Sequence, residues 1–353
     1  MKKLTLLATL ALSLSAQDYK IAVVGLVHSH VWGPLGRMVK GDPAKLVGVS
    51  EKNPELVAEA KKAGVADNLF YDDYSKMLDE VKPDIVWAFV ENNRHLEIAK
   101  ACATRKIHIM FEKPLASTYK EAVEIRDLAK KYNIQVLLNY QMAWWASNYT
   151  AKAIADSGDL GNVYRIRGVV GHGGPGSEGA RNKFFFDWLT DPVKNGAGAL
   201  MDFGCYNALW SLWYFGRPET VYATVQHLRP ERFPKVEDNS TLVLNYKKFS
   251  GVFEGSWDLP RSMQDLEIFG SKASAYMTNG KVEVRKGRDT SAAAITPLAP
   301  ENAEPIAHMI NAIKTGKPLE GMVGLDINVQ VIEIIDAAKE SVKTGRAVRL
   351  SPR

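Results

Sequence analysis

The chain has 353 residues, of which 46% are hydrophobic and 24% charged, a composition typical of soluble globular proteins and sufficient for about two domains. The formal net charge is only +5 and no block of Lys or Arg occurs, which argues against nucleic acid as a partner. The two cysteines, Cys102 and Cys205, form neither a CxxC pair nor a disulfide framework.

The N-terminus differs in character from the rest of the chain. A pair of lysines precedes an apolar run from Leu4 to Leu14, and small residues follow it. This pattern predicts a secretory signal peptide over residues 1–16, cleaved after Ala16 and too short to span a membrane comfortably. We therefore expect an exported, periplasmic protein without a membrane span after cleavage.

Residues 17–138 alternate short apolar runs with helical stretches. Strands are expected at YKIAVVGL, KLVGVS, DIVWAFV, IHIMF and IQVLL. Helices are expected around Trp32 to Lys40 and at NPELVAEAKKAG (Asn53 as N-cap), RHLEIAKACATRK and TYKEAVEIRDLAKKYN (a Thr118/Glu121 capping box). This alternation predicts βαβ units and a doubly wound parallel sheet.

Residues 139–353 follow a different pattern. One apolar helix is expected at ALMDFGCYNALWSLWYFG. It follows a helix near Ser147 to Ser157, the strand NVYRIRGVV and the glycine-rich stretch GHGGPGSEG. Consecutive alternating strands then occupy residues 220–284, and the helices PIAHMINAIKTG and DINVQVIEIIDAAKESVKTG close the chain. We predict an α+β substrate and oligomerisation domain with an open, mainly antiparallel sheet. An uncovered sheet face would suit a homo-oligomer, either a dimer or a tetramer.

The loop VVGLVHSHVWG lies after the first strand and before a helix, where a dinucleotide fingerprint is expected. Of the fingerprint glycines only Gly25 is present, and Val27, His28, Ser29 and His30 fill the following positions. Backbone N–H groups and the helix dipole attract phosphate there whatever the side chains, so we predict a divergent cofactor loop.

Two other interpretations of this loop stay open. The histidines could simply pack or form hydrogen bonds. Alternatively, His28 and His30 could bind a metal, but alternate residues of extended chain point in opposite directions and no third ligand is clustered nearby. We therefore predict no metal. After the second strand, Glu51 is placed to bind the adenosine ribose hydroxyls of NAD, although the neighbouring Lys52 leaves NADP possible.

Two further stretches carry candidate chemistry. In IHIMFEKPLAS, Glu112 and Lys113 directly follow a strand, at the end where open α/β sheets bind ligands. In GAGALMDFGCYNALW, Asp202 and Tyr206 are four residues apart, which predicts one shared helix face. A lysine beside the phenol would lower the pKa of Tyr206 and prepare it for proton transfer. Solvated or purely structural roles are the alternatives.

Several stretches together resemble the Gfo/Idh/MocA family of glucose–fructose oxidoreductases and inositol dehydrogenases. They are VVGL, ENNRHLEIAKACATRKIHIMFEKPLA, DSGDLGNVYRIRG, GAGALMDFGCYNALWSLWYFGRPETV and TGRAVRL. The resemblance implies that residues 17–138 form a Rossmann dinucleotide-binding domain and that a nicotinamide cofactor lies between the two domains. It also implies oxidation of a sugar or cyclitol hydroxyl. By position, it implies that Lys113 lies near the nicotinamide, that Asp202 positions the substrate and that Tyr206 transfers the proton.

The chain also departs from the family pattern. Val90 and Glu91 replace the usual Thr-Pro beside the cofactor and leave Asn92 as the recognisable cofactor residue. We expect an NAD(P)-dependent sugar or cyclitol oxidoreductase. The alternatives are a redox-neutral sugar-modifying enzyme with a tightly held cofactor and a secreted sugar-binding protein with a degenerate pocket. Trp144, Trp145 and Trp188 are candidates for stacking on a sugar, although tryptophans are more often core residues.

Overall fold

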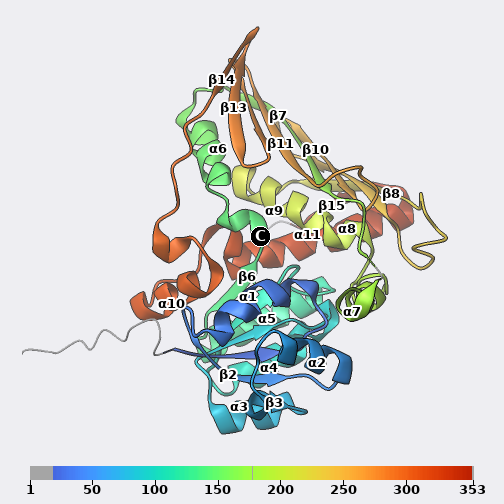
Figure 1. Ribbon diagram of the computed structural model, residues 1–353. Coiled ribbons are helices and arrows are strands. Elements are labelled where there is room, and N and C mark those ends of the chain that lie inside the picture. The colour runs from blue at the N-terminus through green and yellow to red at the C-terminus, as the bar shows by residue number, and fades with distance from the viewer. Residues whose placement is uncertain (1–18, 177, 352–353) are drawn as a thin grey trace, which may run out of the picture.

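The computed structural model describes residues 19–176 and 178–351, and the expected signal peptide, residues 1–16, lies outside the described residues. Two sheets organise the described chain (Figure 1). Within the described part, no helix combines the length and apolar character that a membrane span requires.

The first sheet is parallel and has the strand order β3-β2-β1-β4-β5-β6, so the order reverses between β1 and β4. Ligands of such sheets bind outside the carboxyl ends of the strands at this reversal. The predicted doubly wound fold is confirmed, and the two-residue strand β3 is an addition. The strands are β1 (Lys20–Val24), β2 (Lys45–Ser50), β3 (Phe70–Tyr71), β4 (Ile85–Ala88), β5 (His108–Glu112) and β6 (Val136–Asn139).

Three helices of this domain begin at side-chain caps, and the sequence predicts two of these caps. Asn53 accepts the N–H groups of Glu55 and Leu56 at the start of α2, and Thr118 forms the predicted capping box with Glu121. Helix α3, capped by Asp73, was not predicted. The helices are α1 (Trp32–Val39), α2 (Pro54–Lys62), α3 (Tyr74–Val81), α4 (His95–Ala103) and α5 (Tyr119–Tyr132).

The second sheet is open, with the order β14-β13-β12-β11-β7-β10-β9-β8-β15, and all its pairs are antiparallel except β7 with β10. The predicted mainly antiparallel sheet is confirmed. The edge strands β14 and β15 were not predicted. The strands are β7 (Val163–Gly171), β8 (Thr220–Gln226), β9 (Asn239–Asn245), β10 (Ser250–Ser256), β11 (Met263–Gly270), β12 (Ser274–Thr278), β13 (Lys281–Lys286), β14 (Asp289–Ala292) and β15 (Val348–Arg349).

Helices pack on the inner face of this sheet, and Figure 1 shows α9 and α11 between it and the first domain. The single helix expected over ALMDFGCYNALWSLWYFG is wrong, because it breaks at Phe203 into α8 and α9. Helix α7 was not predicted. The helices are α6 (Ala146–Ser157), α7 (Gly179–Leu189), α8 (Ala199–Asp202), α9 (Gly204–Phe215), α10 (Pro305–Thr315) and α11 (Leu325–Thr344).

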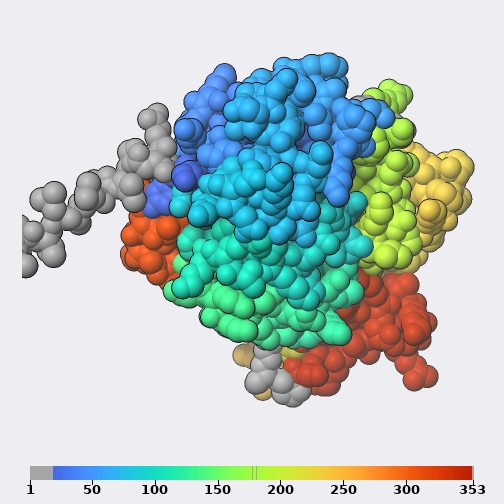
Figure 2. Space-filling model, turned by 90° about the horizontal axis from the view of Figure 1, so that it is seen from below, coloured from blue at the N-terminus to red at the C-terminus, as the bar shows by residue number. Residues whose placement is uncertain are grey.

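Helix α11 joins the two domains. Its Asp336 carboxylate accepts the N–H of Tyr119 at 2.7 Å, and Lys339 donates to the carbonyl of Ser117 at 2.9 Å, both at the start of α5. Seen from below, the first domain covers most of the surface in view and the C-terminal residues lie at its edge (Figure 2). The C-terminal helix is therefore part of the interface that holds the candidate site together.

Candidate active site

A cavity of about 290 Å³ lies where the carboxyl ends of β1 and β5 face the second domain. Three segments supply its chemistry: the loop after β1, the turn after β5, and the break between α8 and α9. The polar side chains lining it include Ser29, His30, Lys113, His172, Asp202 and Tyr206. The structure thus brings together residues that lie far apart in the sequence.

Lys113 and Asp202 form a buried ion pair in this cavity. The Lys113 ammonium contacts Asp202 Oδ1 directly and also donates to the Asp202 carbonyl at 3.1 Å. Trp257 Nε1 donates to the other carboxylate oxygen at 2.8 Å. Burial alone would lower the pKa of Lys113, but the facing Asp202 outweighs it and the pKa is raised. Burial likewise opposes ionisation of Asp202, yet Lys113 lowers its pKa, so both groups are charged.

The break between α8 and α9 follows from this pairing. In a continuous helix the Asp202 carbonyl would accept the N–H of Tyr206, four residues on. Instead it accepts the Lys113 ammonium and the Cys205 thiol, while the Tyr206 N–H donates to Phe203 at 3.1 Å. The prediction that Asp202 and Tyr206 share one helix face is therefore wrong, but both side chains line the cavity.

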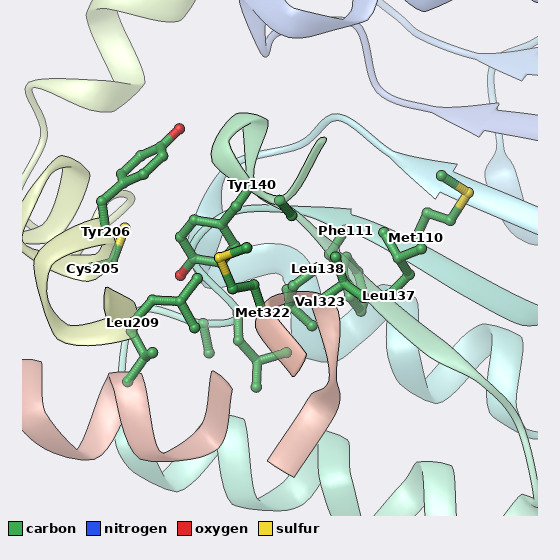
Figure 3. Packing of buried hydrophobic residues seen from close by; sticks show 14 of the residues in the cluster. Met110, Phe111, Leu137, Leu138, Tyr140, Cys205, Tyr206, Leu209, Met322 and Val323 are labelled. Atoms are coloured by element: carbon green, nitrogen blue, oxygen red, sulfur yellow. The ribbon is translucent and has the colours of Figure 1, made fainter. Parts of the chain in front are cut away.

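Tyr206 lies beside the ion pair with its ring centroid 5.1 Å from Lys113 Nζ, and it packs edge-on against Tyr140. Figure 3 shows its hydroxyl pointing away from the apolar residues around Tyr140 and Met322. Burial raises the pKa of the Tyr206 phenol, and the Lys113 charge offsets only part of the effect. The predicted net lowering is therefore wrong, and the phenol carries its proton at neutral pH.

The loop after β1 places two histidines beside the turn after β5. Ser29–Val31 form a single 3-10 turn, and His28 caps it by accepting the His30 N–H at its Nδ1 atom. His30 Nδ1 lies 2.8 Å from Oε2 of the buried Glu112, and Asn139 donates to Glu112 Oε1 at 2.7 Å. The loop is thus joined to β5 and β6 by side-chain hydrogen bonds.

The reasoning against a third ligand near the histidines is wrong. The 3-10 turn brings the rings of His28 and His30 to 4.5 Å between centroids, and Glu112 completes a cluster of the kind that can hold a metal ion. Hydrogen bonds occupy this cluster, however. Since His28 accepts at Nδ1, the proton of its neutral ring is on Nε2, and burial, followed by the nearby cations, lowers the pKa of His28. Within the cluster, His30 thus bonds to Glu112 and His28 bonds to the loop backbone.

A smaller cavity of about 180 Å³ lies at the carboxyl ends of β1 and β2. Its lining residues include Val24, Gly25, Val27, Glu51, Lys52 and Arg94. Gly25 has a φ of +79°, and a Cβ there would lie 2.5 Å from Val90 Cγ1, so only glycine fits. The Glu51 carboxylate accepts the N–H groups of Leu26, Lys52 and Asn53, which fixes it at the rim of this cavity.

The loop after β1 also offers backbone hydrogen-bond donors to a ligand. Its Leu26 and His28 N–H groups are bonded to Glu51 and to the Phe89 carbonyl. Among the described residues, the N–H groups of Val27 and Ser29 meet no acceptor. Unpaired loop donors ahead of a helix fit the phosphates of a dinucleotide.

Other candidate residues lie behind the cavities. Asn92 is buried and donates to the Asn195 side chain at 2.7 Å, which ties the first domain to the second. His95 is also buried, bonds to the Leu115 carbonyl and stacks on Phe111. His95 therefore supports the turn after β5 and Asn92 supports the interdomain contact, and both are absent from the lining of the two cavities.

Of the candidate tryptophans only Trp145 lines the larger cavity, whereas Trp188 is buried and donates to the Val27 carbonyl. Sequence reasoning missed Arg94, which lines the smaller cavity, and it missed Trp257 and Asn139, which bond to Asp202 and Glu112. No local motif marks Trp257 and Asn139, because each bonds to a residue that is distant in the chain.

Comparison with known proteins matches both halves of the chain to one family. Residues 19–140 match the profile described as "Oxidoreductase family, NAD-binding Rossmann fold", and residues 149–276 match the "GFO/IDH/MocA C-terminal domain". The chain is 26% identical over 345 residues to D-xylose 1-dehydrogenase (NADP(+)) 2 of Haloferax volcanii, covering 91% of this chain and 99% of the relative.

Two further similarities agree with this match. Levoglucosan dehydrogenase of Pseudarthrobacter phenanthrenivorans is 27% identical over 194 residues, a region covering 52% of this chain and 46% of that protein. The crystal structure of aldose-aldose oxidoreductase from Caulobacter crescentus, complexed with glycerol, has a TM-score of 0.81 at 20% identity. It covers 94% of this chain and 99% of that chain, which shows a shared fold.

Proposed function

The chain belongs to the Gfo/Idh/MocA family of NAD-binding oxidoreductases, and from this premise we propose that it transfers hydride between a sugar or cyclitol hydroxyl carbon and a nicotinamide cofactor. The observation that carries the proposal is the cluster of Lys113, Asp202 and Tyr206 in the cavity between the domains. The nicotinamide supplies or accepts the hydride when bound, and the protein supplies orientation and proton transfer.

The residues of the two cavities fit a dinucleotide. Glu51 at the smaller cavity is assigned to the adenosine ribose hydroxyls, and its charge favours NAD over NADP. Gly25 gives close backbone approach, and the free N–H groups of Val27 and Ser29 are assigned to the phosphates. The D-xylose relative is named for NADP(+), so NADP is the alternative cofactor.

Residues lining the larger cavity complete the assignment. Ser29, His30 and Lys113 would surround the nicotinamide end. His28, Asn92 and Glu112 are assigned an indirect part in cofactor binding, because they are buried and hold the loop and the interdomain contact in place. With this assignment the cofactor would lie across the carboxyl edge of the first sheet, where such sheets bind their ligands.

Proton transfer is assigned to Tyr206 and Lys113. In the direction of ketone reduction, the protonated phenol donates to the developing alkoxide, and the Lys113 ammonium stabilises the charge on that oxygen. In the direction of alcohol oxidation, the hydroxyl proton returns along the same path. Asp202 fixes Lys113, and its remaining lone pairs can accept a neighbouring substrate hydroxyl.

The character of the cavity supports a polyhydroxylated substrate. Its wall carries hydrogen-bonding side chains from both domains, and Trp145 offers an aromatic face on which a sugar ring could stack. Apart from the catalytic cluster and the two residues assigned to the nicotinamide end, Ser29 and His30, the hydrogen-bonding residues are Gln141, His172, Ser262 and Gln264. The levoglucosan and D-xylose dehydrogenases named above indicate the class of compounds to test first.

A dehydrogenase assay tests the proposal. The purified protein is mixed with NAD+ or NADP+ and with D-xylose, levoglucosan, myo-inositol or methyl α-D-glucoside, and reduced nicotinamide is followed by its absorbance. Lys113→Ala should lower turnover by about 10³-fold. Lys343→Ala is the matched control, because this lysine is exposed near the end of α11. Full activity of Lys113→Ala would contradict the assignment.

We further propose export to the periplasm and a homo-oligomer, either a dimer or a tetramer. The lysine pair and apolar run at the N-terminus support export. The sheet face opposite α9 and α11 supports oligomerisation, since a single described chain leaves it uncovered. N-terminal sequencing of the protein from a cell fraction tests cleavage after Ala16, and light scattering tests the oligomer.

A further inference from the structure

The larger cavity carries a second acid–base pair, His30 with Glu112, distinct from the Lys113 cluster. Glu112 is fully buried and accepts from His30 Nδ1 at 2.8 Å and from Asn139 at 2.7 Å. Because a carboxylate only accepts hydrogen bonds, the proton of the neutral His30 ring is on Nδ1, which leaves a lone pair on Nε2. A buried carboxylate beside a histidine fixes its tautomer and the orientation of its ring.

The free nitrogen of His30 is available to a bound molecule. The His30 side chain is 32% exposed and lines the cavity together with Lys113 and Tyr206. Within residues 19–176 and 178–351, no group hydrogen-bonds to His30 Nε2. The pair is therefore a base with an open position in the cavity, and the proton transfer assigned to Tyr206 and Lys113 does not use it.

Chemistry indicates which proton this base acts on. Hydride transfer moves one proton, that of the reacting hydroxyl, and Tyr206 with Lys113 already serves it. The ketone so formed has C–H bonds on the adjacent carbons, and a carbonyl polarised by Lys113 and Tyr206 makes those hydrogens acidic. These C–H protons are the ones left for a second base in the same cavity.

We propose that His30 removes and returns a proton from the carbon next to the carbonyl of the ketone, with Glu112 as its positioning residue; this inference rests on the proposed function. The C–H bond breaks, its proton goes to His30 Nε2, and its electron pair forms a double bond to the carbonyl carbon. The resulting charge on oxygen is stabilised by Lys113 and Tyr206. Return of a solvent-derived proton regenerates the ketone, so no co-reactant is needed.

Deuterium exchange tests this step. Protein saturated with NAD+, which cannot donate hydride, is incubated with methyl α-D-ribo-hexopyranosid-3-ulose in D2O, and the proton signals beside the carbonyl are followed by NMR. Reduction of the same ketone with NADH is measured separately. We expect exchange about 100-fold faster than without protein. His30→Asn should lower exchange about 100-fold and reduction less than tenfold.

Further variants separate chemistry from structure. In His30→Ala, added imidazole should restore part of the exchange, which a merely structural role would not allow. Glu112→Gln should lower exchange about tenfold without rescue by imidazole. His172→Asn is the matched control, since His172 lines the same cavity but its Nδ1 accepts the Gly174 N–H. It should lower exchange and reduction by the same factor.

The outcomes are distinguishable. Reduction without exchange overturns the inference and leaves the proposed function in place. Absence of both reduction and exchange overturns both. A melting curve shows whether the His30→Asn protein is folded. If it is folded and its exchange rate is unchanged, another group is the base and the inference is overturned.

Discussion

Trp257 Nε1 donates to Asp202 Oδ2 at 2.8 Å, and so holds the carboxylate whose other oxygen pairs with Lys113. The contact joins the end of β10 to the break between α8 and α9. The orientation of the lysine in the cavity therefore depends on a tryptophan that is itself absent from the cavity lining.

Trp257→Phe tests this dependence. Losing the indole N–H and part of a fully buried side chain should lower the free energy of unfolding by about 2–4 kcal/mol. It should also lower kcat about 10- to 100-fold, because Asp202 and Lys113 are less firmly placed. Urea unfolding and steady-state kinetics measure both effects. Trp213→Phe, at a partly exposed tryptophan, is the control, and equal losses in the two variants would refute the dependence.

Asp202→Asn should be strongly destabilising, since it leaves the Lys113 ammonium buried without its counter-ion; we expect a loss of about 3–5 kcal/mol. The way this loss of stability depends on pH follows from the pKa shifts of Asp202 and Lys113. The lowered pKa of Asp202 gives stability that is lost as pH falls through that pKa, and the raised pKa of Lys113 gives stability that is lost as pH rises through it. The difference from wild type should thus be largest between about pH 4 and pH 10. Unfolding at several pH values checks this, and a difference that grows below pH 4 would contradict it.

The two directions of the reaction should depend differently on pH. Burial raises the pKa of Tyr206, so the phenol stays protonated through the neutral and mildly alkaline range. Ketone reduction, which uses the protonated form, should be independent of pH there, whereas alcohol oxidation should rise about tenfold per pH unit. Initial rates in both directions measure this. Tyr206→Phe should abolish the rise, and a rise that persists would assign the proton to another group.

Gly25→Ala should weaken cofactor binding and lower the free energy of unfolding by about 1–3 kcal/mol, because of its positive φ and the contact with Val90. Gly33→Ala is a matched control in α1, where an added Cβ meets no atom within 4 Å. It should be neutral or stabilising by about 0.5–1 kcal/mol. Calorimetric titration with NAD+ and urea unfolding compare the two. Equal NAD+ affinity in Gly25→Ala and wild type would count against the cofactor loop.

Glu51→Gln should shift cofactor preference toward NADP. Removing one negative charge near the expected 2′-phosphate should raise the ratio of kcat/KM for NADP over NAD about tenfold, equivalent to about 1.4 kcal/mol. The amide oxygen can still accept loop N–H groups, so the loop keeps part of its support. Asp67→Asn, at a highly exposed carboxylate, is the control and should leave the ratio unchanged. An unchanged ratio in Glu51→Gln would remove Glu51 from the ribose site.

Periodicity and caps made most of the fold predictable. The capping box of Thr118 and the N-cap Asn53 lie where the sequence places them, because both depend only on neighbouring residues. Strand β3 escaped prediction because two residues carry no period, and the edge strand β14 because all four of its residues are exposed.

The candidate site was predictable only in part. Lys113, Asp202 and Tyr206 stand in motifs, and the structure brings them together. The pairing of His30 with Glu112 spans 82 positions and depends on β1 and β5 both flanking β4, which no local pattern reveals. The helix break at Phe203 was missed for a similar reason, since the group that diverts the Asp202 carbonyl comes from the other domain.

Helix α11 restricts the motion of the two domains relative to each other. It packs against α9 and β8 in one domain and against α5 in the other, and Asp336 and Lys339 fasten it to the start of α5. Rotation of one domain against the other would break these bonds and expose the buried side of a twenty-residue helix. The contacts of α11 with both domains therefore oppose rotation of one domain against the other.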